Sequence, residues 1–87
     1  MNRSALIDNV IAALTGVAPE IDPTALKPAV NFRDQFEFEL DSVDYLNFVL
    51  DMERRLGIRI PEMDCPRLSC LDGCLSYCAG RGLIEAD

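Results

Sequence analysis

The segment from Ser42 to Leu56 constrains the fold more than any other part of the chain, because its apolar residues recur at helical spacing between clear start and stop signals. Asp41 precedes the segment as an N-cap, and Asp44 places a carboxylate in the first turn, where the helix dipole favours negative charge. Gly57 follows at the position where helices commonly end in a left-handed residue. The pattern predicts an amphipathic helix with an apolar side of Val43, Leu46, Val49, Leu50 and Leu56.

A second helix is predicted from Ser4 to Thr15, near the N-terminus. Ser4 is the expected cap, and Gly16 is the expected end because glycine adopts the left-handed conformation at little cost. The helical stripe consists of Leu6, Ile7, Val10, Ile11 and Leu14.

A third helix is predicted from Cys70 to about Ala79, with Ser69 as its cap and Gly80 and Gly82 at its end. Its buried stripe has the i, i+3, i+4, i+7 spacing of one helix face. The stripe residues are Leu71, Cys74, Leu75 and Cys78.

Residues 17–41 are predicted to form a long loop, because three prolines, Pro19, Pro23 and Pro28, prevent a long helix there. A loop of this length needs anchors in the core. The expected anchors are Ile21, Leu26, Val30, Phe32, Phe36, Phe38 and Leu40. Residues 36–40 alternate with period two, as in a strand, but no second alternating run offers a partner.

Residues 58–61 are expected to be an extended connector pinned by Ile58 and Ile60, and residues 62–68 a short irregular helix limited by Pro66. Together the segments predict an all-α protein, a small four-helix bundle with three main helices and one short one. With 87 residues, the chain fits a single domain spanning residues 1–87. The predicted core includes Leu46, Val49, Leu50, Leu71 and Leu75.

The composition excludes several classes of function. A net charge of −7 repels phosphate backbones, so we expect no nucleic-acid partner. The chain contains no histidine, which removes the commonest general base and the commonest nitrogen ligand for metals. No apolar run reaches the roughly 20 residues of a membrane span, and no secretory signal is recognisable. We therefore expect a cytoplasmic protein without membrane insertion.

The four cysteines, Cys65, Cys70, Cys74 and Cys78, all lie near the C-terminus, and the absence of a signal peptide favours reduced thiols. Their spacing differs from the paired C-x2-C pattern of zinc sites. A metal or redox site is one interpretation, and a structural role as small buried apolar side chains is the favoured one. We predict no metal site.

The acidic side chains near the helix at residues 42–56 do not form a convincing acid/base pair. Glu37 and Glu39 alternate with phenylalanines and are expected to be solvated. Asp51 and Glu53 lie close to Arg54 and Arg55, the pattern of a helix surface with weak local ion pairs.

The dipeptide Asp41-Ser42 stands at the junction of the long loop and the helix. Taken alone, it would be an ordinary helix cap. No histidine or lysine stands nearby in sequence to activate Ser42 as a nucleophile, but its hydroxyl could be modified by another enzyme. The free N–H groups and the dipole at the start of a helix also suit a phosphate.

The chain resembles the acyl carrier proteins at three places: the run LDSVDYL at 40–46, the connector LGIRIP at 56–61, and LSCL at 68–71. The resemblance covers the last three predicted helices, and the first helix and loop match in length and pattern. Its most specific parts are the Asp-Ser-Val motif and the Ile-Pro connector at its proper distance.

The resemblance implies a small four-helix bundle in which Ser42 is the attachment site for 4′-phosphopantetheine, which carries acyl groups as thioesters. It implies a non-catalytic monomer that is modified by a phosphopantetheinyl transferase. The expected partners are acyl-transferring, ligase or ketosynthase-type enzymes of fatty acid, polyketide or related lipid biosynthesis. The family's second helix offers acidic side chains to basic partners. By position, the expected partner surface is Asp41, Val43, Asp44, Asp51 and Glu53.

The chain departs from the family pattern at Asn47, at Arg54 and Arg55, in a longer Phe-rich loop, and in its Cys-rich last helix. These differences make a specialised pathway comparable to a general role in fatty acid synthesis. Two alternatives stay open. One is a peptidyl or aminoacyl carrier, and the other is an unmodified acidic helical interaction module.

Overall fold

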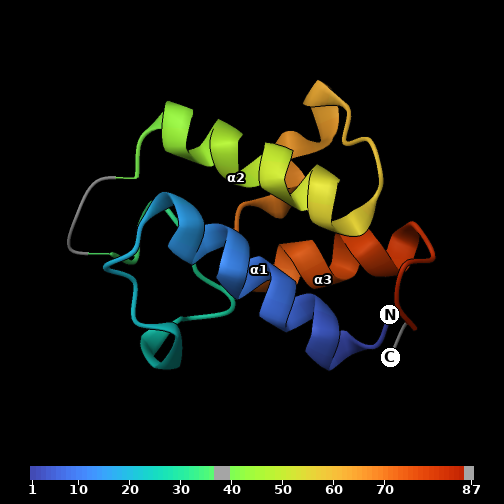
Figure 1. Cartoon of the computed structure of the whole chain (residues 1–87), viewed down its shortest axis with the longest axis horizontal. Coiled ribbons are helices and arrows are strands. Elements are labelled where there is room, and N and C mark those ends of the chain that lie inside the picture. The colour runs from blue at the N-terminus through green and yellow to red at the C-terminus, as the bar shows by residue number, and fades with distance from the viewer. Residues whose placement is uncertain (37–39, 86–87) are drawn as a thin grey trace.

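The computed structural model describes residues 1–36 and 40–85, and within these residues all regular structure is helical. The α-helices are α1 (Arg3–Val17), α2 (Ser42–Leu56) and α3 (Leu71–Gly80), with short 3₁₀ helices η1 (Pro23–Ala25) and η2 (Glu62–Leu68). In Figure 1, α1 and α3 both lie below α2, and α1 packs against α2 and against α3. The predicted all-α bundle with three main helices is confirmed, as is the short helix before the last one. The short helix η1 was not predicted.

The structure corrects both predicted ends of α1. The cap is Asn2, not Ser4, because the Asn2 side chain accepts a hydrogen bond from the N–H of Ala5 at 2.8 Å. Asparagine caps helices as well as serine does, so composition alone could not separate the two. The helix also continues through Gly16 to Val17, and the left-handed glycines of the described residues are Gly57 and Gly82.

The start of α3 is also corrected. Its cap is Cys70, whose Sγ accepts a hydrogen bond from the N–H of Gly73 at 3.3 Å. The neighbouring Ser69 instead uses its backbone carbonyl to accept the N–H of Phe32 at 2.8 Å, which ties the long loop to the end of η2. The helix ends at Gly80, in agreement with the prediction, and all four residues of its predicted stripe are buried.

The predicted ends of α2 are confirmed. Asp41 caps the helix by accepting the N–H of Asp44 at 2.8 Å, and the Asp44 carboxylate accepts the N–H of Asp41 in return. Each carboxylate thus satisfies a backbone donor that the helix itself cannot satisfy. Gly57 closes the other end with a φ of 65°.

The predicted apolar side of α2 is only partly correct, because Val49 is buried and Leu56 packs against the core but the other three residues are exposed. Val43, Leu46 and Leu50 are 63%, 53% and 51% exposed, whereas Phe48, Val49 and Met52 are buried. The sequence contains two apolar faces on this helix, and the face with the larger side chains packs inward, where it removes more apolar area from water. Val49 is buried, as are Leu71 and Leu75, so these three residues of the predicted core are confirmed.

The long loop is held by side chains that enter the core. Ile21, Phe32 and Leu40 are buried, as predicted, and Leu26 and Phe36 are partly buried against the core. The predicted anchor Phe38, the carboxylates Glu37 and Glu39, and most of the alternating run at 36–40 lie outside the described residues. Phe32 meets the ring of Phe48 edge to face, with centroids 5.5 Å apart. This contact anchors the loop at Phe32, ten residues before the predicted attachment site Ser42.

The connector after α2 behaves as predicted, with Ile60 buried and Ile58 packed against the core. It leads into η2, which contains Pro66. The backbone of η2 then approaches α3 so closely that a Cβ built on Gly73 would lie 2.5 Å from the carbonyl oxygen of Arg67. Glycine is therefore required at this helix contact.

Candidate functional site

Ser42 is the first residue of α2 and is exposed. Its position is fixed by the capping box of Asp41 and Asp44, and by the N–H of Tyr45, which donates to the carbonyl of Asp41 at 3.0 Å. Arg33 supports the approach to the motif, because its Nε donates to the carbonyl of Leu40 at 3.0 Å. The serine hydroxyl is therefore presented outward from a well-defined helix start.

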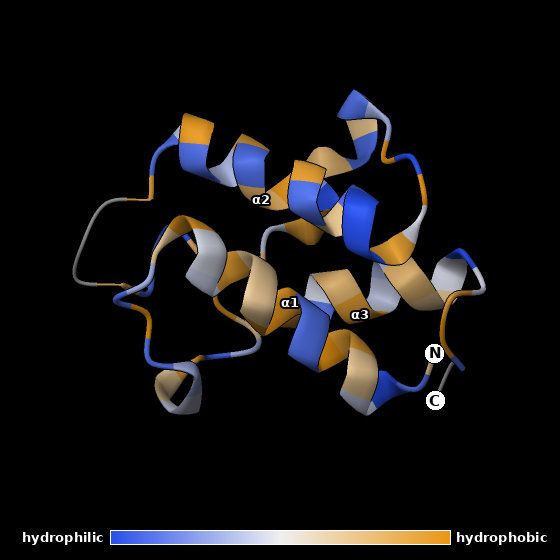
Figure 2. Ribbon diagram, viewed as in Figure 1, coloured by the Kyte–Doolittle hydropathy of each residue, from blue (hydrophilic) through white to orange (hydrophobic). Residues whose placement is uncertain are grey.

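Three apolar residues of α2, Val43, Leu46 and Leu50, form a strip on the exposed side of the helix. Their i, i+3, i+7 spacing places them on one face at 3.6 residues per turn. Figure 2 shows hydrophobic and hydrophilic stretches alternating along the ribbon of α2. We call Val43, Leu46 and Leu50 the apolar strip. It begins one residue after Ser42.

Two of the acidic side chains expected to bind partners are engaged within the chain. Asp51 forms ion pairs with Arg54 and with Arg55, the latter at 2.8 Å. The hydrogen bond from Arg55 holds the pKa of Asp51 below its usual value, and Arg54 contributes in the same direction. Glu53 accepts the N–H of Ile60 at 2.8 Å, which fastens the connector to α2.

The predicted partner residues fall into two groups along α2. Asp41, Val43 and Asp44 surround Ser42 at the start of the helix. Asp51 lies nine residues after Ser42, which is about 13 Å along the helix axis at 1.5 Å per residue. Leu46 and Leu50 are exposed, not in the core as predicted, and their spacing with Val43 is that of a separate helix face.

Tyr45 joins α2 to η2. Its hydroxyl donates a hydrogen bond to the backbone carbonyl of Cys65, and its ring lies against Phe48 with centroids 6.0 Å apart. Burial raises the pKa of the Tyr45 phenol above its usual value, and the nearby thiols, Cys74 foremost, act in the same direction. The phenol therefore stays protonated and acts as a donor at neutral pH.

Tyr77 makes the corresponding connection between η2 and α3. Its hydroxyl donates to Asp64 at 2.9 Å and accepts from Arg81 at 2.8 Å. The guanidinium of Arg67 lies 4.9 Å from the centre of the Tyr77 ring. These contacts hold η2 against α3.

Two of the four cysteines, Cys74 and Cys78, are core residues, whereas Cys65 and Cys70 are partly buried. Cys74 and Cys78 are fully buried, and burial raises the pKa of both thiols. Burial also raises the pKa of Cys65, with a contribution from the charge of Glu53. All four are free thiols. Among residues 1–36 and 40–85, no group of three or more cysteine or acidic side chains is arranged to hold a metal ion.

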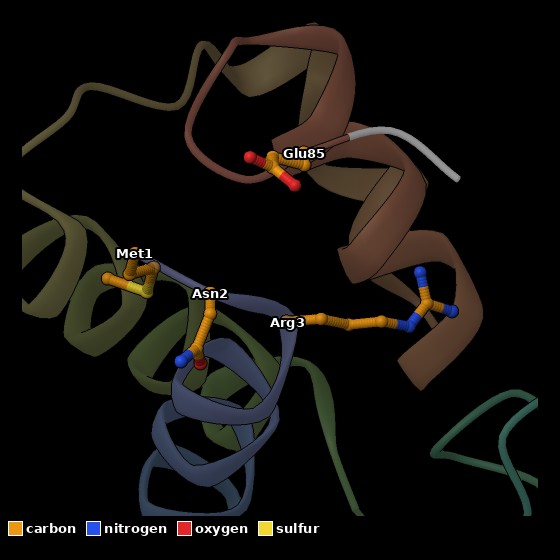
Figure 3. Close-up of a pocket in the computed structure, with 4 residues that line it drawn as sticks. All are labelled: Met1, Asn2, Arg3 and Glu85. Atoms are coloured by element: carbon orange, nitrogen blue, oxygen red, sulfur yellow. The ribbon is translucent and has the colours of Figure 1, made fainter.

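Three surface pockets differ in charge. One lies at the chain ends and is lined by Met1, Asn2, Arg3 and Glu85; Figure 3 shows Arg3 extending away from the other two N-terminal side chains. A second lies along the loop, and its lining includes the acidic Glu20 and Asp22. The third lies beside α2 and is lined by Asn31, Arg33, Tyr45, Pro66 and Ser69. Sequence reasoning did not anticipate this last pocket.

The comparisons with known proteins place the chain near carriers of acyl groups. It is 24% identical over 81 residues to a protein named acyl carrier protein 2, mitochondrial, from Arabidopsis thaliana, and the match covers 93% of this chain but 62% of that protein. It is 22% identical to an acyl carrier protein of Rubrobacter xylanophilus and 23% identical to one of Thermosynechococcus vestitus. Each of these two matches covers 88% of this chain and 91% of the relative.

No protein-family model matches the chain. The three relatives carry the same kind of name, and the described residues of this chain form an all-helical bundle. Within the described ranges, no helix is both long and apolar enough to cross a membrane. The relationship to acyl carrier proteins is therefore supported by distant similarity along most of the chain.

Proposed function

We propose that this chain is an acyl carrier protein in which Ser42 bears 4′-phosphopantetheine as a phosphodiester. The observation that carries the proposal is the exposed Ser42 hydroxyl at the first residue of α2, directly after the capping residue Asp41. The distant similarity to proteins named acyl carrier protein supports it. A phosphopantetheinyl transferase would supply the group from coenzyme A.

The surroundings of Ser42 suit a phosphodiester. No residue of the described chain accepts a hydrogen bond from the N–H of Ser42 or of Val43, and both groups belong to the positive end of the α2 dipole. The group, once attached, supplies the thiol on which an acyl chain is held as a thioester. The chain itself anchors the arm, orients it at the helix start and leaves the chemistry to its partners.

The carrier role follows from tethering. A flexible arm fixed at one end raises the concentration of its cargo at each docked enzyme without any catalytic group in the carrier. The chain contains no histidine, and the two carboxylates that flank Ser42, those of Asp41 and Asp44, each accept a backbone N–H in the capping box. We therefore propose a non-catalytic protein that serves enzymes of fatty acid, polyketide or related biosynthesis. Location in the cytoplasm remains part of this proposal, and the Arabidopsis relative is named as mitochondrial.

We further propose that partners dock on α2 through the apolar strip, with Asp41 and Asp44 beside Ser42 as its charged border. Exposed apolar residues in a contiguous group mark interaction surfaces. Because Asp51 is neutralised by Arg54 and Arg55, the electrostatic contribution from the far end of the helix is small. Glu53 completes the predicted acidic surface, although its carboxylate also holds the connector.

The modification is tested by co-expression with a broad-specificity phosphopantetheinyl transferase and intact mass measurement. We expect one phosphopantetheine adduct on the wild-type chain and none on Ser42→Ala. Ser69→Ala and Ser76→Ala are controls that retain the adduct. A chain that acquires no adduct, or a Ser42→Ala variant that still acquires one, would contradict the proposal and favour an unmodified interaction module.

The docking surface is tested with the same transferase in a kinetic assay. Leu46→Asn should raise the KM of transfer several-fold, whereas Asp51→Asn should change it little. Leu46 is exposed, so the variant keeps its fold and the comparison reports on docking alone. A larger effect from Asp51→Asn, lost at high salt, would instead indicate recognition by the acidic side chains.

A further inference from the structure

A small pocket lies one helical turn from Ser42 and outside the docking surface. Its volume is about 280 Å³, and its walls come from the loop before α2, from α2 itself, and from the junction of η2 with α3. We call it the Arg33 pocket. The lining residues are Asn31, Arg33, Tyr45, Pro66 and Ser69.

Hydrogen bonds fix the walls of the Arg33 pocket. The N–H of Phe32 donates to the carbonyl of Ser69 at 2.8 Å, which joins the loop to the η2–α3 junction. The N–H of Arg33 donates to the Asn31 side chain at 2.9 Å. Tyr45 in turn is tied to η2 through the carbonyl of Cys65. The pocket is therefore built from three segments that are cross-linked to one another.

The charge of the pocket is opposite to that of the protein. The chain carries a net charge of −7, yet the lining contains one guanidinium and no carboxylate. The Nε of Arg33 is bound to the carbonyl of Leu40. Its two terminal nitrogens have no ion pair or hydrogen bond to any residue of the described ranges, so they are available to an anion from outside the protein.

The position of the pocket indicates where such an anion would come from. Ser42 and Tyr45 are three residues apart on one helix, so their side chains are neighbours on its surface. Ser42 itself does not line the pocket, and a phosphate esterified to its hydroxyl would therefore lie outside. A group at the far end of a flexible arm can fold back into it.

We propose that the Arg33 pocket binds a short acyl group that ends in a carboxylate, with the carboxylate held by the guanidinium of Arg33. The volume of about 280 Å³ lies just below the usual range for ligand pockets, roughly 300–1,000 Å³, which excludes a long alkyl chain. The Asn31 amide and the Ser69 hydroxyl supply further polar partners. This inference rests on the proposed function and narrows it to the class of cargo.

The test compares two cargoes of equal length. A transferase loads isotope-labelled protein from butyryl-coenzyme A or from succinyl-coenzyme A, whose acyl groups differ in having a methyl or a carboxylate at the end. Nuclear magnetic resonance then follows the Nε–H of Arg33 and the backbone amides of Asn31 and Tyr45. We expect these signals to shift with the succinyl load and to stay near their free-thiol positions with the butyryl load.

Two matched variants test whether Arg33 is the group that binds the carboxylate. Arg33→Gln should abolish the difference between the two loads at Asn31 and Tyr45, whereas Arg59→Gln, which removes an exposed guanidinium elsewhere, should retain it. The wild-type comparison needs no substitution, so the proposal stays testable even if Arg33→Gln disturbs the loop.

Intact mass separates failure of this inference from failure of the proposed function. A chain that accepts no load at Ser42 overturns the carrier proposal itself. A loaded chain with identical spectra for succinyl and butyryl overturns the Arg33 pocket as a carboxylate site while leaving the carrier proposal intact. Shifts at Arg33 that are already complete in the free-thiol form would assign the guanidinium to the phosphodiester instead, and would also overturn it.

Discussion

The rings of Phe32 and Phe48 meet edge to face with an interplanar angle of 70° and centroids 5.5 Å apart, and both side chains are fully buried. One ring comes from the long loop and the other from the centre of α2. This contact sets the rotation of α2 about its own axis. It turns Phe48 into the core and leaves Leu46 outside, so the surface next to Ser42 depends on an aromatic pair beneath it.

The first prediction concerns this rotation. Phe48→Leu should lower the free energy of unfolding by roughly 1 kcal/mol or more, and Phe48→Ala by about 3–5 kcal/mol, because a cavity replaces the ring. Leu46→Ala should change it by less than about 0.5 kcal/mol, since Leu46 is half exposed. Urea unfolding followed by circular dichroism measures all three. A loss for Leu46→Ala as large as that for Phe48→Ala would contradict this arrangement.

The ends of α2 could be predicted from sequence, but its buried face could not. Capping depends only on residues close in sequence, so the roles of Asp41, Asp44 and Gly57 can be predicted without knowledge of the tertiary structure. The buried face depends on what packs against it. This helix has two apolar stripes, and the one that contains Phe48 is buried because it packs against Phe32. These two residues are sixteen positions apart in the sequence.

In the candidate site, too, local features could be predicted from sequence and tertiary features could not. Ser42 was found from a motif, and its exposure at the helix start is a local consequence of the capping box. The Arg33 pocket could not be found this way, because its walls come from three segments that only tertiary hydrogen bonds bring together. The ion pairs of Asp51 with Arg54 and Arg55 could be predicted from their i, i+3 and i, i+4 spacing.

The second prediction concerns the close contact between η2 and α3. Gly73→Ala should lower the free energy of unfolding by about 1–3 kcal/mol, because the new methyl group would collide with the backbone carbonyl of Arg67. Gly16→Ala is the matched control. No atom lies within 4 Å of a Cβ at that position and Gly16 is within α1, so alanine should stabilise the protein by up to about 1 kcal/mol. Thermal unfolding should therefore move in opposite directions for the two variants.

The third prediction concerns Tyr45 and alkaline pH. Tyr45→Phe should cost about 0.5–1.5 kcal/mol at neutral pH, since the carbonyl of Cys65 loses its donor. The pKa of Tyr45 is raised in the folded protein, so the wild type keeps its full stability below the ordinary tyrosine pKa of about 10 and loses stability as the pH rises above it. In Tyr45→Phe that loss should be shallower.

Unfolding free energies measured by urea between about pH 8 and pH 11 test this dependence. Burial also raises the pKa of Tyr77 and of three thiols, and these groups are present in both proteins. Only the difference between wild type and Tyr45→Phe is therefore diagnostic. Parallel curves for the two proteins would mean that Tyr45 ionises as freely in the folded chain as in the unfolded one.

The fourth prediction concerns Asp51 in acid. Its pKa is lowered in the folded protein, so its ion pairs stabilise the fold above the unfolded pKa of about 3.9, and this stability is lost as the pH falls through the folded pKa. Asp51→Asn should cost about 0.3–1 kcal/mol at neutral pH and low salt. The cost should vanish in strong acid and shrink at about 1 M salt, where the Debye length is roughly 3 Å.

Glu20→Gln is the control for this measurement, because Glu20 is exposed and has no ion pair within the described residues. Its stability should follow that of the wild type at every pH. If Asp51→Asn also follows the wild type, Asp51 is a solvated charge that is free to meet a basic partner, and docking would then be expected to weaken with salt. If the stability of Asp51→Asn differs from that of the wild type as predicted, Asp51 is ion-paired with Arg54 and Arg55. Partners would then bind the carrier chiefly through Val43, Leu46 and Leu50.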